Sequence, residues 1–141
     1  MSGIKRTAAD KAFSDCIRER VNWTCERCGK YYPPGARAGL DFSHHHSLGN
    51  WSIRFEPLNA EALCTGCHFL TGGTQERREE VLTKQQEELL YELKNCLFRG
   101  RELRRTKGRG EIAKHYRNEH ARMKALRFTG VTKRVEFRGW L

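Results

Sequence analysis

Hydrophobic residues recur at helical spacing near the start of the chain. The positions that carry this pattern in TAADKAFSDCIRERV are Ala8, Phe13, Cys16, Ile17 and Val21. A helix places residues with this spacing on one side and leaves the charged residues between them on the other. The pattern therefore predicts a helix over residues 7–21.

Two shorter stretches have the composition of strands. Residues 39–47, GLDFSHHHS, predict a first strand that leads into a Gly-Asn turn. Residues 51–57, WSIRFEP, alternate apolar and polar side chains and predict a second strand that ends at Pro57. A helix is then expected to begin near Ala62, and the glycine pair that starts at Gly72 ends it.

The second half of the chain is predicted to be mostly helical. Residues 75–98 contain strong helix formers with a broken apolar stripe, and residues 111–128 form a further amphipathic segment. Between them, residues 99–110 hold six Lys or Arg and three Gly, which predicts a mobile basic linker. Residues 129–141 carry apolar side chains at even spacing and predict a strand or an ordered tail.

Composition narrows the class of protein and of partner. The 141 residues are 38% hydrophobic and 31% charged, so the core must be small and a metal or disulfide is expected to reinforce it. The formal net charge of +10 favours a polyanion, with nucleic acid as the first expectation. No long apolar run predicts a membrane span, and the polar N-terminus lacks a signal-peptide pattern. We therefore expect an intracellular protein with reduced cysteines.

Four of the six cysteines form two pairs, Cys25-x-x-Cys28 and Cys64-x-x-Cys67, separated by 35 residues. A two-residue spacer lets both thiolates of a pair reach one tetrahedral ion, and two such pairs fill the coordination of zinc. The spacing predicts a structural zinc site that clamps the intervening segment. The other two cysteines lack such a pattern and are expected to pack as small apolar residues.

The clamped segment contains three consecutive histidines, His44, His45 and His46. Neighbouring side chains on a strand point to opposite faces, so the three cannot share one site. Asn59 follows on a later loop or helix start, and His68 comes directly after the last cysteine of the clamp. His46 is expected to be solvated or to face a phosphate, without a catalytic role.

The pattern SHHH, PLN and LCTGCH resembles the zinc-ribbon branch of the HNH endonucleases, whose ββα-metal fold holds one divalent ion between two strands and a helix. The resemblance implies an α+β fold: a ββα-metal core stapled by a four-cysteine zinc ribbon, with a flanking N-terminal helix and a helical, basic C-terminal arm. It divides the chain into a nuclease core over residues 1–74 and a DNA-contact region over residues 75–141, which packs on the core or extends from it.

The resemblance also assigns roles. It implies that His45 is the general base, that His44 and His68 bind the catalytic ion, and that Asn59 orients the basic imidazole through its other ring nitrogen. A neutral imidazole can take a proton from water, and a divalent ion can bind the scissile phosphate and stabilise the leaving oxygen. A phage-type pattern aligns its single histidine with His44 instead. In that register Asp41, alone or with His44, holds the metal and His45 is a lining residue.

Beyond the core, three stretches are similar to the lambdoid phage recombination endonucleases of the NinG or Rap type: KRTAADKAFSDCIRERVNWTCERCGK, RFEPLNAEALCTGCH and EIAKHYRNEHARM. This resemblance implies an enzyme of the bacterial cytoplasm, encoded by a phage or prophage, that nicks or cuts branched DNA. Mn²⁺ or Mg²⁺ would serve as the catalytic ion beside the structural Zn²⁺. The competing hypothesis is a zinc-ribbon DNA-binding recombination accessory protein without activity.

Candidate DNA contacts come from two places. Arg54, on the predicted second strand, is either a surface arginine or a phosphate clamp beside the metal, since its guanidinium fork matches phosphate oxygens. The other candidates share a basic C-terminal segment: Arg101, Arg104, Arg105, Lys107, Arg109, Lys114 and Arg117. Such residues give affinity without specifying sequence. The sequence leaves open which DNA is cut and whether the chain forms a homodimer.

Overall fold

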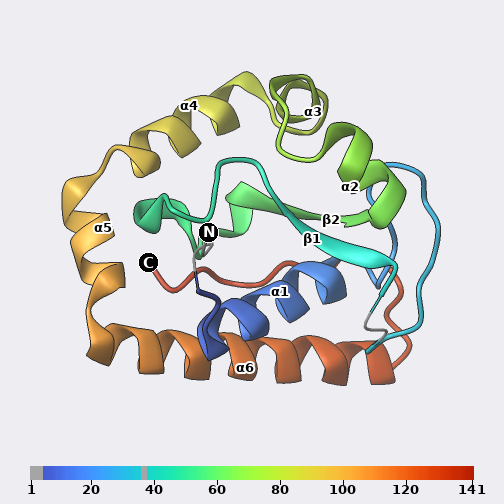
Figure 1. Ribbon diagram of the computed structural model, residues 1–141. Helices are drawn as coiled ribbons and strands as arrows, with labels where there is room; N and C mark the ends of the chain where they lie inside the picture. Colours follow the sequence, from blue (N-terminus) through green and yellow to red (C-terminus); the bar gives the residue numbers. More distant parts are fainter. Residues whose placement is uncertain (1–4, 36–37) are drawn as a thin grey trace.

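The protein is represented by a computed structural model that describes residues 5–35 and 38–141, without the side chains of residues 106–109 (Figure 1). The described part is α+β, with six α-helices and one two-stranded antiparallel sheet. The elements are α1 (Ala8–Arg20), β1 (Leu40–His44), β2 (Ala60–Cys64), α2 (Thr65–Thr71), α3 (Gln75–Val81), α4 (Lys84–Lys94), α5 (Leu97–Arg104) and α6 (Thr106–Phe128). None of the described helices combines the length and apolar character that a membrane span requires.

The helix predicted over residues 7–21 is confirmed as α1. Thr7 caps its first turn by accepting a hydrogen bond from the backbone N–H of Asp10, and the Asp10 carboxylate accepts one from the backbone N–H of Thr7 in return. This capping box satisfies N–H groups that the first turn leaves without helical partners. Phe13 and Ile17, on the predicted apolar face, are buried in the core.

The sheet pairs β1 with β2, and the register runs from Leu40 opposite Cys64 to His44 opposite Ala60. The observed first strand lies within the range predicted for it, residues 39–47. The prediction of a second strand over residues 51–57 is wrong. That stretch begins with a 3₁₀ turn at Trp51–Ile53, and the second strand follows at Ala60–Cys64. Local backbone hydrogen bonds, such as that from the Ile53 N–H to the Asn50 carbonyl (3.1 Å), replace a strand ladder there.

The C-terminal half shares the core of the N-terminal half. α6 runs beside α1 (Figure 1), and the Tyr116 ring lies 5.0 Å, centre to centre, from Phe13. The tail after α6 has neither helix nor strand, yet it packs on the same core through Val135 and Phe137. Residues 129–141 were expected to form a strand or an ordered tail, and the structure has the ordered tail.

The mobile linker predicted over residues 99–110 is wrong. α5 occupies its first part, and α6 begins at Thr106. Leu103 is fully buried in the core, and Arg99 donates a hydrogen bond from Nε to the Ser52 carbonyl (2.6 Å). The basic composition of this stretch does not indicate these two contacts, the burial of Leu103 and the hydrogen bond from Arg99, which hold α5 in place.

Candidate functional site

The four cysteines of the two pairs come together, as their spacing predicts. Their Sγ atoms all lie within 4.8 Å of one another, so the cluster could hold a metal ion. Cys25 and Cys28 lie on the knuckle after α1, while Cys64 ends β2 and Cys67 lies in the first turn of α2.

Backbone groups favour the charged form of one thiol in this cluster. The Cys67 N–H points to the Cys64 Sγ at 3.4 Å. This contact lowers the pKa of Cys64 to about 6. A thiolate is the form that binds metal, so the local backbone prepares a ligand in place.

The knuckle is also bound to the sheet by hydrogen bonds. The Glu26 N–H donates to the Ala62 carbonyl (2.9 Å), and the Ala62 N–H donates to the Glu26 carboxylate (2.7 Å). These hydrogen bonds join the knuckle to β2, and the cysteine cluster joins both to α2, so the three form one unit. His68 occupies the position directly after this unit's last cysteine.

His68 is oriented by a carboxylate. Its Nδ1 lies 3.0 Å from Oδ2 of Asp41 on β1, and both side chains remain partly exposed. When Nδ1 donates to a carboxylate, the tautomer leaves the Nε2 lone pair free, which is the usual arrangement of a metal-binding histidine. Asp41 and His68 thus form a carboxylate–histidine pair that is suited to hold an ion.

His44 ends β1, and its ring packs on Phe42, 4.3 Å between centres. Its Nε2 is buried and has no hydrogen-bond partner among the described residues. Burial, followed by the charge of Arg6, lowers the pKa of His44 to about 4, so the imidazole is neutral at pH 7. A Cβ on Gly72 would meet the His68 ring, and a Cβ on Gly73 would lie 3.2 Å from the His44 carbonyl, so the chain after α2 packs against the end of β1.

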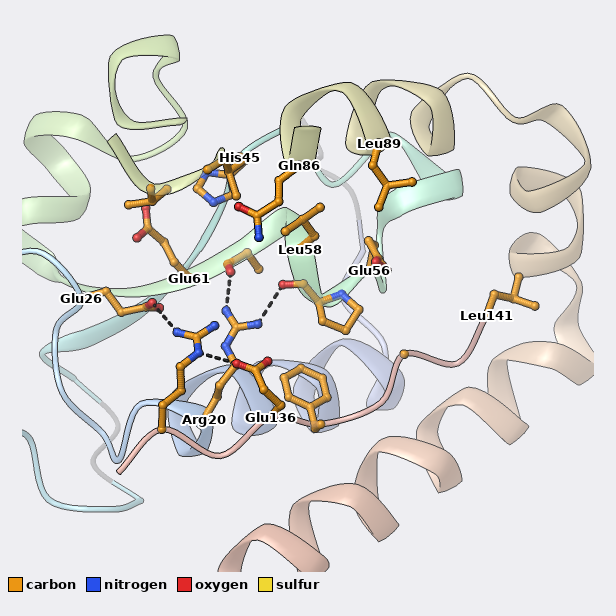
Figure 2. A pocket seen from close by; sticks show the side chains of 17 residues that line it. Arg20, Glu26, His45, Glu56, Leu58, Glu61, Gln86, Leu89, Glu136 and Leu141 are labelled. Atoms are coloured by element: carbon orange, nitrogen blue, oxygen red, sulfur yellow. Dashed lines mark hydrogen bonds and ion pairs between the residues drawn. The ribbon is translucent and has the colours of Figure 1, made fainter. Parts of the chain in front are cut away.

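His45 lies in a different environment. It is 4% exposed and lines a cavity of about 730 Å³ between β2, α4 and the C-terminal tail. In Figure 2, His45 and Gln86 lie on one side of this cavity, and Arg20 and Glu136 lie on the other. Burial and the charge of Arg78 lower the pKa of His45 to about 4. His45 thus lines a cavity with residues of β2 and α4, and its role as a general base stays a prediction.

Asn59 does not orient an imidazole. Its Oδ1 accepts a hydrogen bond from the His46 N–H (2.9 Å), and its Nδ2 donates to the carbonyls of His46 (3.1 Å) and Ile53 (3.3 Å). The side chain is 1% exposed. The expected role is corrected: Asn59 bonds to both ends of the loop between His46 and Ile53, and so fixes the backbone that follows the histidines.

Arg54 is also placed differently from its prediction. It follows the 3₁₀ turn rather than lying on a strand, and it is 1% exposed. Its Nε and Nη2 donate to the two carboxylate oxygens of Asp10 at 2.9 and 2.7 Å, and its guanidinium stacks over the Trp51 ring. A buried guanidinium paired with a carboxylate is not a surface phosphate clamp, so this interpretation is corrected.

The basic C-terminal candidates lie on α5, on α6 and, in the case of Arg105, between the two helices. Five of them are exposed: Arg101, Arg104, Arg105, Lys114 and Arg117. The side chains of Lys107 and Arg109 lie outside what the structure describes. Arg105 pairs with Glu102 at 2.9 Å, an ion pair within one helical turn at the surface. A DNA interface along these helices stays a prediction.

Sequence reasoning missed two residues that shape the site. Asp10 neutralises Arg54, and the spacing Thr7-x-x-Asp10 before an apolar run was a signal for the capping box, though not for the ion pair. Gly72 was interpreted only as a helix breaker. A Cβ at this position would lie 2.3 Å from Cδ2 of His68, so glycine is needed for the close packing of the chain on that imidazole.

Comparison with known proteins gives no relative: no family model, no curated protein and no solved structure matches this chain.

Proposed function

We propose that this protein is a metal-dependent DNA endonuclease with an HNH-type core formed by β1, β2 and α2. One observation carries the proposal: a neutral His44, whose Nε2 has no partner among the described residues, ends the strand whose Asp41 carboxylate orients His68. This combination supplies a proton acceptor and a metal ligand around the same strand. The resemblance of the motif to HNH endonucleases supports the same conclusion.

His68 would hold the divalent ion, Mn²⁺ or Mg²⁺, through Nε2, and Asp41 would fix the ring orientation and the tautomer of the neutral imidazole through Nδ1. Bound there, the ion would act as a Lewis acid toward the phosphate. His44 would accept the proton of the attacking water, because its lowered pKa leaves the ring neutral, and therefore able to take up a proton, at pH 7. Asn59 would hold the loop after His46 in place without touching the reacting atoms.

In the same proposal the four-cysteine cluster is a structural zinc ribbon. Four thiolates leave no open coordination position, so this ion would stabilise the fold and take no part in hydrolysis. Its contribution to activity would be to hold α2, and with it His68, against the end of β2. The exposed arginines of α5 and the basic face of α6 would supply sequence-independent contacts to DNA phosphates.

The decisive experiment compares neighbouring alanine variants on supercoiled plasmid with Mn²⁺ or Mg²⁺. His44→Ala should lower the nicking rate by about 10²- to 10⁴-fold, the usual contribution of a general base. His68→Ala should abolish nicking, and Asp41→Asn should weaken metal affinity by about 10- to 100-fold. His45→Ala is the matched control, since it removes the adjacent imidazole from the other environment and should keep the activity.

The outcomes separate the hypotheses. Loss of nicking in His45→Ala together with a fully active His44→Ala would restore His45 as the base. If the wild-type protein leaves plasmid intact with every metal tested but still binds DNA, the chain is a zinc-ribbon DNA-binding protein without nuclease activity.

A further inference from the structure

Two large apolar side chains are exposed on α2 immediately after His68. Phe69 is 90% exposed and Leu70 is 69% exposed. Burying a side chain of this size stabilises a protein, and neither residue makes this contribution to the fold. α2 lies at the periphery of the molecule in Figure 1. The pair is therefore open to a ligand that approaches His68.

The backbone that presents Phe69 is fixed at both ends. At the start of α2 the Cys64 Sγ accepts from the Cys67 N–H. At the end of the helix, a Cβ on Gly72 would lie 3.0 Å from Oγ of Ser43 on β1, so the chain packs closely there. The Cα of Phe69 is about 3.8 Å from that of His68. An aromatic ring is thus presented from a rigid position beside the proposed metal ligand.

Positive charge flanks the pair. Near the start of α2, the exposed Arg27 donates from Nη1 to the Cys67 Sγ at 3.5 Å. Just beyond its end, Arg78 donates from Nη1 to the Gly73 carbonyl at 3.0 Å. Guanidinium groups at both ends of an exposed apolar step match a phosphate backbone on either side of a base step.

The size of the patch selects among ligands. An aromatic side chain covers about 150–250 Å², whereas a specific protein–protein interface buries about 1,200–2,000 Å². A Phe–Leu pair is too small for such an interface but matches the apolar wedges that proteins insert between DNA base steps.

We infer that Phe69, backed by Leu70, inserts into the base stack next to the phosphate held at His68. The inference rests on the proposed function and adds a positioning residue for it. Opening a base step costs stacking free energy, and this cost is least at a mismatch. The protein should therefore favour duplexes whose stacking is already weakened at the cleavage site.

The test measures unstacking directly, with the full chain and without added Mn²⁺ or Mg²⁺. Duplexes carry 2-aminopurine at successive positions, in matched and mismatched versions, and binding is followed in parallel by anisotropy. Wild type should raise the 2-aminopurine fluorescence and bind the mismatched duplex more tightly. Phe69→Ala should lose the fluorescence rise and about tenfold in affinity, while Phe69→Trp should retain both. Phe128→Ala is the matched control: this residue is 94% exposed at the end of α6, away from the site.

Each outcome decides. An equal fluorescence rise with wild type and Phe69→Ala overturns the inference and leaves the nuclease proposal intact. Plasmid nicking by a wild-type protein that never raises the fluorescence does the same. A wild-type protein that neither binds nor nicks DNA overturns both. Since Phe69 is exposed, an unchanged thermal midpoint for Phe69→Ala will show that its loss of signal does not come from unfolding.

Discussion

The buried ion pair between Asp10 and Arg54 offers a sharp test of how the turn at residues 51–53 is held. Both side chains are at most 2% exposed, and two parallel hydrogen bonds join them. Burial alone would raise the pKa of Asp10, but the Arg54 guanidinium and the hydrogen bonds from Thr7 together more than offset this and hold that pKa below its ordinary value. Replacing Asp10 with alanine would leave the guanidinium buried without a counter-charge.

The expected loss follows from two contributions. Breaking a buried pair by removing one partner costs about 3–5 kcal/mol, and losing the capping box with Thr7 costs about 1 kcal/mol. Because the two effects share one side chain, they will not add fully, and we expect Asp10→Ala to lower the free energy of unfolding by about 4 kcal/mol. That is a large part of the 5–15 kcal/mol typical of a domain.

The assay is a double-mutant cycle measured by urea unfolding at pH 7. Replacing both residues, with Arg54→Met to keep an apolar side chain of similar length, removes the unpaired charge and should recover most of the loss. Lys11→Ala is the control, because it breaks the ion pair with Asp15 on the same helix; Lys11 is 79% exposed there. It should change stability by less than about 0.5 kcal/mol. If Asp10→Ala is as mild as Lys11→Ala, or if the double variant is less stable than Asp10→Ala, the reasoning is refuted.

Three further predictions concern the site. Cys64→Ser should release the bound zinc and lower the thermal midpoint, measured by a colorimetric zinc assay and circular dichroism, whereas Cys96→Ser, outside the cluster, should do neither. Asn59→Ala leaves the His46 N–H and two buried carbonyls without this partner and should cost about 2 kcal/mol in urea unfolding; a change below 0.5 kcal/mol would contradict the role of Asn59 in fixing this loop. In the folded protein, His44 and His45 have pKa values of about 4, below the ordinary value of about 6.5. Between these pH values the unfolded chain therefore binds more protons than the folded one. The free energy of unfolding should fall as the pH drops from about 6.5 to 4, by up to about 1.4 kcal/mol per pH unit for each histidine. His45→Gln should flatten this slope, and an unchanged slope would show that His45 is not buried in its neutral form.

Local patterns predicted much of the fold. The apolar spacing and the Thr7-x-x-Asp10 signal specify α1, because capping and one-sided burial act within a few residues. The alternation of side chains on a strand predicts that His44 and His45 point apart; β1 ends at His44, and the structure gives the two rings different neighbours. The paired cysteine spacing was sufficient to predict the cluster.

The elements that could not be predicted depend on partners far along the chain. The stretch WSIRFEP alternates like a strand, but Arg54 is buried because Asp10, 44 residues earlier, neutralises it. Asn59 could be identified as important but not assigned to its partners, since these are backbone groups of a loop whose shape the residue itself fixes. The basic stretch at residues 99–110 became helix because Leu103 reaches a core that the local composition does not show.

These long-range contacts also fix the backbone on both sides of the histidines. The Asp10–Arg54 pair fixes the turn after the histidines, and Asn59 closes the loop between them. The cysteine cluster holds α2 at the end of β2. β1 contacts both α1 and α2. Burial and then the charge of Arg6 lower the pKa of His44, whereas burial and then the charge of Arg78 lower that of His45. The two neighbouring imidazoles therefore have different surroundings, and for this reason we propose His44 as the base and use His45→Ala as its control.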